Sequence, residues 1–475
     1  MNLATGRRCR AVGLGVVGLV SALALSVRPA LAQVLPHEPT IDRLPNGLTV
    51  VVLPFDSPGI AAYFTLVRTG SRDEVEPGHS GFAHLFEHMM FRGTRTLNAA
   101  QYEFRMQALG ADNNAYTTDD FTLYTITLPS TSVPGLIPVE ADRFQHLFYS
   151  EQMFQTETHA VLGEYNKNSA SPSQGMWEQL SELAFSQHTY GHTTMGYLRD
   201  IQAMPRYYRY AQQFFRRFYT PDNCTIIVAG DVHRDQILPL IQQHYGPWAG
   251  HRATPTIPVE PDQTAARSRA LAWEGTTPNR MIVGYRIPAY VSETVDAVAL
   301  QVVHSLAFTE ASDLYQRLVV HDQHLLTLES WRQDFHRDPQ LFIVEARLTP
   351  QITFDQVTQA IQDEIARIGR GEYPRERIAQ VVSNLRYSLP MEAQTPSDAA
   401  NLIARFVAMT GDVHALDRYV QHLQAVTPDD VARVARTYLL TARRSVITVM
   451  QADRAPAGTT HFGPNGSHTA ARRPH

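Results

Sequence analysis

Residues 215–230 read FRRFYTPDNCTIIVAG and residues 434–450 read VARTYLLTARRSVITVM, so two distant parts of the chain end in the same way. Each stretch has a helical pattern that ends in an aromatic residue, then a short polar break, then a run of β-branched residues typical of a buried strand. A duplicated unit of helices and strands explains both endings.

The chain of 475 residues is long enough for two such units. We expect an N-terminal domain over residues 33–250 and a homologous C-terminal domain over residues 269–452. Residues 251–268, which are rich in Pro, Thr and Ala, are expected to link them. Residues 453–475 are rich in Gly, Pro, Thr and His, and we expect this tail to be disordered.

The first residues have the pattern of a secretory signal peptide. Arg7 and Arg8 precede an apolar run from Ala11 to Leu25, and the small-residue site Ala30-Leu31-Ala32 follows. A membrane anchor is the alternative, but the apolar run is short for a membrane span. We therefore expect cleavage after residues 1–32, a periplasmic or secreted protein, and no membrane anchor after the signal is removed.

Charge and cysteine content exclude some partners and chemistries. The formal net charge is −5, from 41 basic and 46 acidic residues, and it becomes −9 without the four arginines of the signal peptide. An acidic chain gives no reason to expect nucleic acid as a partner. Cys224 is the one cysteine that remains, and its apolar neighbours favour a packed thiol over a nucleophile.

The stretch GHSGFAHLFEHMMFRGT, residues 78–94, places ionisable groups inside an otherwise apolar helix that we expect to begin after an N-cap at Ser80. His84 and His88 are four residues apart, so both imidazoles point to one side of the helix, and Glu87 shares that side. Two neutral imidazoles on adjacent turns form a bidentate zinc clamp, and a neighbouring carboxylate can accept a proton from water.

A catalytic zinc site needs a third protein ligand. The predicted helix QTETHAVLGEYNKN, residues 155–168, supplies Glu157 and Glu164, which are seven residues apart and so lie on one face. Without the histidine motif, a solvated acidic face would be the preferred interpretation of these two glutamates.

Taken together, these motifs resemble the pitrilysin/insulysin family of inverzincin zinc metallopeptidases, in particular its processing-peptidase-like branch. In that family an HxxEH motif is followed by a ligand glutamate at about the spacing seen here, where residues 89–163 separate His88 from Glu164. The resemblance extends to GSRDEVEPGHSGFAHLFEHMMFRGT, NAYTTDDFTLYTI, YGHTTMGYLRDI and FYTPDNCTIIVAGDV.

The resemblance implies an α+β fold of two homologous halves, each a mostly antiparallel sheet covered by helices on one face, which face each other across a cavity. It implies that His84, His88 and Glu164 bind one Zn²⁺ per chain. Glu87 would be the general base that takes a proton from water, and Glu157 would support the site without binding the metal.

The resemblance also implies how peptide is bound and whether the chain works alone. Asn114 and Ala115 begin an extended segment that borders the zinc site as a sheet edge, where a peptide can bind as an added strand. Family members that act alone carry an arginine and a tyrosine in the second half, but here Val319 and Leu326 occupy those positions. A homologous partner subunit would then supply the missing pair.

We therefore expect a zinc-dependent endopeptidase that hydrolyses unstructured peptides, as the catalytic subunit of a heteromeric peptidase. One alternative is a non-catalytic structural or assembly subunit of the same fold, which the complete ligand set disfavours. Another is a metal-binding module without turnover, which would not need Glu87.

Overall fold

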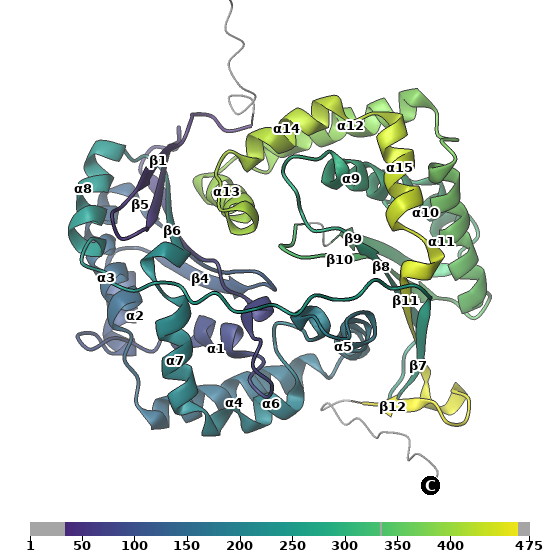
Figure 1. Ribbon diagram of the computed structural model, residues 1–475, viewed down its shortest axis with the longest axis horizontal. Coiled ribbons are helices and arrows are strands. Elements are labelled where there is room, and N and C mark those ends of the chain that lie inside the picture. Colours follow the sequence, from purple (N-terminus) through teal and green to yellow (C-terminus); the bar gives the residue numbers. More distant parts are fainter. Residues whose placement is uncertain (1–33, 333–334, 464–475) are drawn as a thin grey trace, which may run out of the picture.

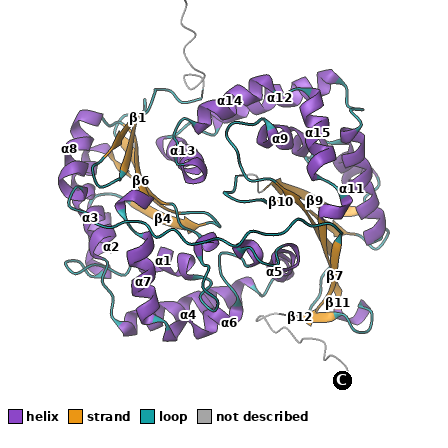
Figure 2. Ribbon diagram, in the orientation of Figure 1, coloured by secondary structure: helices purple, strands orange, loops and turns teal. Residues whose placement is uncertain are grey.

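The computed structural model describes residues 34–332 and 335–463. The predicted signal peptide lies outside these ranges. Within them the chain forms two six-stranded sheets, one in each half of the sequence, with helices packed around them (Figures 1 and 2). The α+β class and the two-half architecture are thus confirmed.

The two sheets share the order of five of their six strands. In the first sheet, neighbouring strands run β1 (Thr40–Arg43), β2 (Thr49–Pro54), β6 (Cys224–Gly230), β3 (Ile60–Val67), β5 (Thr122–Pro129) and β4 (Asp112–Thr117). In the second, they run β12 (Thr460–Phe462), β7 (Arg267–Trp273), β11 (Arg444–Gln451), β8 (Asn279–Ile287), β10 (Gln340–Leu348) and β9 (Leu325–Arg332).

The pairing directions of these five strands agree as well, whereas the outermost strands differ, because β1 pairs antiparallel with β2 and β12 pairs in parallel with β7. β2 pairs with β6 in parallel, as β7 does with β11, and the next three neighbours in each sheet pair antiparallel. The two similar stretches quoted above end in β6 and β11, which occupy equivalent places in the two sheets. The expected duplication is therefore present in the topology.

Helices cover one face of each sheet with elements of the same half. The first half contributes α1 (Phe82–Met89), α2 (Ala99–Ala108), α3 (Val133–His146), α4 (Glu151–Asn168), α6 (Leu198–Ala203), α7 (Tyr208–Phe218) and α8 (Arg234–Tyr245). The second contributes α9 (Asp296–Ala307), α10 (Asp313–Tyr315), the π-helix η7 (Gln316–His321), α11 (Phe354–Gly369), α12 (Arg375–Met391) and α15 (Pro428–Tyr438), while α14 (Ala415–Ala425) packs on α9, α12 and α13. Their apolar sides form one large core in each half.

The other face of each sheet is covered by a helix from the opposite half, so the expectation of a single covered face was incomplete. α13 (Pro396–Thr410), which belongs to the second half, packs on β3, β5 and β6 of the first sheet (Figure 1). α5 (Pro172–Ala184), from the first half, packs on β7, β8 and β11 of the second. Ile403 of α13 and Leu180 of α5 are fully buried in these contacts. The two halves therefore share their cores.

Two equivalent hairpins also join the halves. Asp119 lies in the turn between β4 and β5, and its Oδ2 is 3.2 Å from Nε2 of His336, between β9 and β10. Close by, Asp338 forms an ion pair with Arg72, and its Oδ2 is 3.1 Å from Nε2 of His188. The Asp119–His336 contact connects the ends of the two hairpins, and the contacts of Asp338 connect the second hairpin to other segments of the first half.

Two cavities are lined by residues of both halves. One of about 260 Å³ lies between the β4 edge of the first sheet and α13, lined among others by Asn114 and Asn401. Another of about 480 Å³ is lined by residues of α4, α5 and α6 and by Thr460 of β12.

The predicted linker and the C-terminal tail test further expectations. Residues 251–266, within the predicted linker, form no helix or strand. Residues 460–462, expected to be disordered, instead form β12, which pairs in parallel with β7. The ring of Phe462 packs against Trp273 at 4.9 Å between centroids, so a buried aromatic contact holds this part of the tail.

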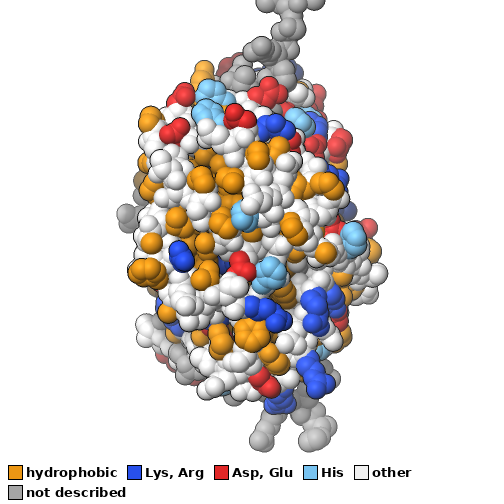
Figure 3. All heavy atoms as spheres, turned by 90° about the vertical axis from the view of Figure 1, so that its left-hand side faces the viewer, with side chains coloured by type: hydrophobic (Ala, Val, Ile, Leu, Met, Phe, Trp, Pro, Cys, Tyr) orange, Lys and Arg blue, Asp and Glu red, His pale blue; other side chains and the backbone are white. Residues whose placement is uncertain are grey.

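The surface is mixed in character. On the face shown in Figure 3, hydrophobic side chains are scattered among polar ones, acidic side chains gather toward the upper end and basic ones toward the lower end.

Cys224 is buried at the start of β6, and burial raises the pKa of its thiol, which confirms a packed rather than a reactive cysteine. Among the described helices, none has the length and apolar character needed to cross a bilayer.

Candidate metal centre

The helix that carries the HxxEH motif begins differently from the expectation. The N-cap of α1 is Gly81, whose φ of 89° lies in the left-handed region that glycine tolerates, and not Ser80. Ser80 instead donates its hydroxyl to Asp200 at 2.6 Å. The carboxylate of Glu74 accepts hydrogen bonds from the backbone N–H groups of Gly81 at 2.7 Å and Ala83 at 2.6 Å. This buried carboxylate stabilises the positive end of the helix that follows.

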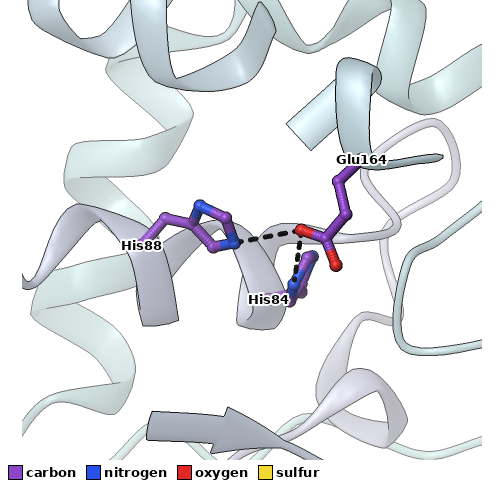
Figure 4. A group of neighbouring side chains, drawn as sticks. All are labelled: His84, His88 and Glu164. Carbon is purple, nitrogen blue, oxygen red and sulfur yellow. Dashed lines mark ion pairs between the residues drawn. The ribbon is translucent and has the colours of Figure 1, made fainter. Parts of the chain in front are cut away.

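His84, His88 and Glu164 come together at one point between α1 and α4 (Figure 4). Oε2 of Glu164 lies 3.7 Å from Nε2 of His84 and 3.4 Å from Nε2 of His88. Ligands about 2.0–2.2 Å from a tetrahedral zinc ion lie roughly 3.3–3.6 Å from one another. The donor set of two imidazoles and one carboxylate, at these separations, fits such an ion.

The ring of His88 is oriented by a contact at its second nitrogen, Nδ1. Its Nδ1 is 2.9 Å from Oε1 of Glu157, and Arg92 forms an ion pair with the other oxygen of that carboxylate. Burial alone would lower the pKa of His88, but the bond to Glu157 and the negative charges of Glu157, Glu87 and Glu164 together outweigh burial and raise the pKa. Burial would likewise raise the pKa of Glu157, but the bond to His88 and the charge of Arg92 lower it. With Nδ1 occupied, Nε2 is the nitrogen left to face Glu164.

His84 is held in the neutral form. The residue is only 8% exposed, and burial together with the nearby imidazole of His88 lowers its pKa to about 4. A neutral imidazole has a free lone pair, which is the state that a metal ligand requires.

Glu87 points from α1 toward the edge strand β4. Its Oε2 accepts the hydroxyl hydrogen of Thr117 at 2.6 Å, and the backbone N–H of Thr117 also bonds to the carboxylate. Burial raises the pKa of Glu87, and the bonds from Thr117 only partly offset this shift. A carboxylate with a raised pKa is a stronger base once it is ionised.

Asn114 and Ala115 lie in β4 at the outer edge of the first sheet. Oδ1 of Asn114 accepts the backbone N–H of Ala115 at 2.9 Å, so this N–H is not used by the neighbouring strand β5. The edge therefore has a backbone donor that is satisfied by a side chain of the same strand.

In the second half, the side chains at the two positions where the family's arginine and tyrosine were expected provide no hydrogen-bond donor. Val319, in the π-helix η7, packs against the core of that half, and Leu326, in β9, is 56% exposed. Hydrocarbon side chains can neither donate to an oxyanion nor bind a carbonyl oxygen.

Similarity to known proteins agrees with this geometry. Residues 50–197 match the family Insulinase (Peptidase family M16), and residues 209–385 match the Peptidase M16 inactive domain. The chain belongs to the M16, or pitrilysin-type, peptidase family. It is 25% identical to a protein named zinc protease PqqE of Helicobacter pylori over 431 residues, which cover 89% of this chain and 95% of that protein.

Solved structures of relatives share the fold. A protease from Helicobacter pylori superimposes with a TM-score of 0.82 at 25% identity, over 87% of this chain and 99% of that one. The periplasmic protease PqqL from Escherichia coli has a TM-score of 0.71 at 17% identity, over 89% of this chain but 49% of that one. The M16 fold described above thus spans about half of the longer protein.

Three residues around the site were missed by sequence reasoning. Glu74 caps α1 from a distance, Arg92 holds Glu157, and Thr117 holds Glu87. Each lies within a stretch that carried the family resemblance, but each acts on a partner far away in the sequence or on another element. Arg92, four residues after His88, is the one that helical spacing could have identified.

Proposed function

We propose that this protein is a zinc-dependent endopeptidase that hydrolyses unstructured peptides. His84, His88 and Glu164 would bind one zinc ion, Glu87 would be the general base, and Glu157 would orient His88. The observation that carries the proposal is the convergence of two imidazole nitrogens and one carboxylate oxygen within 4.8 Å of one another. A further half-buried carboxylate, Glu87, lies on the helix that carries the two histidines.

A zinc ion at this site would act as a Lewis acid that lowers the pKa of water and polarises a peptide carbonyl. The remaining steps belong to the chain's own residues. Glu87 accepts a proton from the attacking water and later delivers it to the leaving amine nitrogen. Glu157 keeps the tautomer and the ring orientation of His88 fixed while this happens.

Peptide would bind along β4. The N–H of Ala115 becomes available when the side chain of Asn114 turns away, and a peptide carbonyl can then replace it. Backbone pairing of this kind recognises an extended chain and not a particular sequence, which suits unstructured peptides. We further propose that the mature protein is exported to the periplasm or secreted, because the first 32 residues have the pattern of a signal peptide.

Cleavage of a quenched, unstructured peptide tests the activity. We expect the metal-loaded protein to cut the peptide, a chelator to abolish cleavage, and added zinc to restore it. Glu87→Gln should keep the metal and lose roughly a hundredfold or more of kcat, because only the base is removed. A Glu87→Gln variant with wild-type turnover would contradict the proposal, and a wild type that binds zinc without cleaving any peptide would favour a metal-binding module.

We also propose that a homologous partner subunit completes the site. Val319 and Leu326 leave the second half without the donors that would stabilise an oxyanion, and loss of one such donor typically costs about a hundredfold or more in turnover. The coverage of about half of PqqL is compatible with two copies of this fold working together. Co-expression with a homologue that has the arginine and tyrosine but no HxxEH motif should raise activity strongly; full activity of the chain alone would contradict the partner.

A further inference from the structure

The edge strand β4 bonds to helix α1 through its last residue, Thr117. The hydroxyl of Thr117 is 2.6 Å from Oε2 of Glu87, and its backbone N–H bonds to the same carboxylate. Charge-assisted bonds of this length are among the stronger hydrogen bonds in proteins. One residue therefore supplies two donors to the proposed general base.

The hydroxyl has little else to bond. Oγ1 of Thr122 is 3.5 Å away, at the limit for a hydrogen bond, and Thr122 donates its own hydroxyl to the carbonyl of Thr69 at 3.0 Å. Thr117 has a single hydroxyl proton, and the shorter contact to Glu87 is the one that holds it. Oε2 is thereby fixed, and Oε1 is left as the oxygen that can accept a proton.

Strand alternation explains why residue 117 faces the helix. Ala115 packs against the helix-side core of the first half, whereas Tyr116 turns to the opposite face and donates its hydroxyl to Asn401 of α13 at 2.8 Å. Residues two apart point the same way, so Thr117 lies on the same side as Ala115. The strand whose edge would pair with peptide is thus the strand that holds the base.

We propose that Thr117 is a positioning residue for Glu87. By holding Oε2, Thr117 leaves Oε1 to form the new O–H bond as an O–H bond of the attacking water breaks. The inference rests on the proposed function of Glu87 as the base, and it adds a residue that the HxxEH motif does not contain. The competing interpretation is that Thr117 only stabilises the end of the strand.

A set of three variants separates the two interpretations. Thr117→Val keeps the shape and the β-branching but removes the hydroxyl, and Thr117→Ser keeps the hydroxyl. Thr65→Val is the matched control, because Thr65 lies in β3 of the same sheet and its buried hydroxyl has no hydrogen-bond partner among the described residues. All are compared with the wild type in the assembly in which the wild type cleaves a quenched peptide.

For Thr117→Val we expect kcat to fall roughly tenfold to a hundredfold, because small misplacements of a catalytic group cost about that much. KM and zinc content should be unchanged, since the bond to Glu87 acts on turnover. Thr117→Ser should recover most of kcat, and Thr65→Val should match the wild type. Equal kcat in Thr117→Val and wild type, or a serine variant no better than valine, would overturn the role of Thr117.

A measurement without turnover checks the contact itself. In the metal-free protein, Thr117→Val should lower the urea midpoint of unfolding, and this shift should shrink when Glu87 is already alanine. An equal shift in both backgrounds would overturn the inference even if activity fell. A wild type without peptidase activity would instead overturn the proposed function, and the catalytic part of the inference with it, so the two failures are distinguishable.

Discussion

Helices α1 and α9 occupy equivalent places in the two halves but have very different side chains. Each follows the equivalent strand, β3 or β8, and packs against equivalent neighbours, α4 and α7 in one half and α12 and α15 in the other. In α1 two histidines and a glutamate share one side. The buried residues of α9 are all apolar: Ala297, Val298, Ala299, Leu300, Val302, Val303, Leu306 and Ala307.

The difference shows which features belong to the fold and which were added to it. An apolar helix fills this place well, so the fold does not require ionisable groups there. Burying such groups costs free energy unless they are paired or bind a metal. A bond from helix to edge strand, by contrast, occurs in both halves: Glu87 to Thr117 in one, and Nε2 of His304 to the carbonyl of Ser330 at 2.9 Å in the other.

The largest expected effect is on metal content. His84→Ala in α1 should reduce bound zinc from about one per chain to near zero, because a site with three protein ligands tolerates little loss. His304→Ala in α9 should leave metal content unchanged, since its ring bonds to the carbonyl of Ser330. Elemental analysis of both purified variants checks this. Full zinc occupancy in His84→Ala would show that the ligands lie elsewhere.

The next largest effect should be on stability, when a buried side chain is removed from α5 or α13, the helices that cover the sheet of the opposite half. Leu180→Ala in α5 and Ile403→Ala in α13 each remove a fully buried side chain, and each should cost about 2–5 kcal/mol of unfolding free energy. Because each helix covers the sheet of the other half, we expect the wild type and both variants to unfold in a single transition. Denaturant titration followed by circular dichroism measures this. Two separate transitions, with only one shifted, would show that the halves are independent.

The contacts of Asp338 with His188 and Arg72 should make a smaller contribution to stability, and this contribution should depend on pH. Burial opposes ionisation of Asp338, but its bonds with His188 and Arg72 outweigh this and lower its pKa to about 2. A carboxyl with a depressed pKa stabilises the fold above its unfolded pKa of roughly 4 and loses that contribution as the pH falls toward 2. Because the side chain is 27% exposed, solvent screening reduces the contribution to about 1–2 kcal/mol.

Asp338→Asn is the variant that tests this contribution. It should be less stable than the wild type at pH 6, and the two should converge as the pH falls from about 4 to 2. Urea unfolding at several pH values measures the difference. A stability gap that stays constant over this window would show that the charge of Asp338 is not what stabilises its contacts with Arg72 and His188 of the first half.

Local patterns predicted those parts of the structure that are set by neighbours in the sequence. The helix expected over residues 155–168 lies within α4, Glu151–Asn168, and the helix expected to carry the HxxEH motif is α1, Phe82–Met89. The spacing of His84, Glu87 and His88 placed all three on one side of a helix. Periodicity and capping act within a few residues, so sequence alone is sufficient for them.

Contacts between distant segments could not be predicted in this way. The apolar pattern of α13 predicts that one face is buried, but it does not indicate whether that face packs on the sheet of its own half or on the sheet of the other half. Gly81 rather than Ser80 begins α1 because Glu74 reaches the free N–H groups, and that requires a folded loop. Thr117 reaches Glu87 only after β4 lies beside α1. Each of these depends on tertiary packing, which a single sequence does not display.

The smallest effect we predict concerns the N-caps of α5 and α13, two helices that begin with similar sequences. The hydroxyl of Thr395 accepts the N–H of Asp398 at 3.2 Å and donates to its carboxylate at 2.6 Å, whereas the hydroxyl of Ser171 accepts the N–H of Ser173 at 3.3 Å. Thr395→Ala should therefore cost about 1 kcal/mol of unfolding free energy and Ser171→Ala about half of that. Urea titration of both variants checks the order. A larger loss for Ser171→Ala would mean that α5, and not α13, is the helix whose start limits the stability of the shared cores.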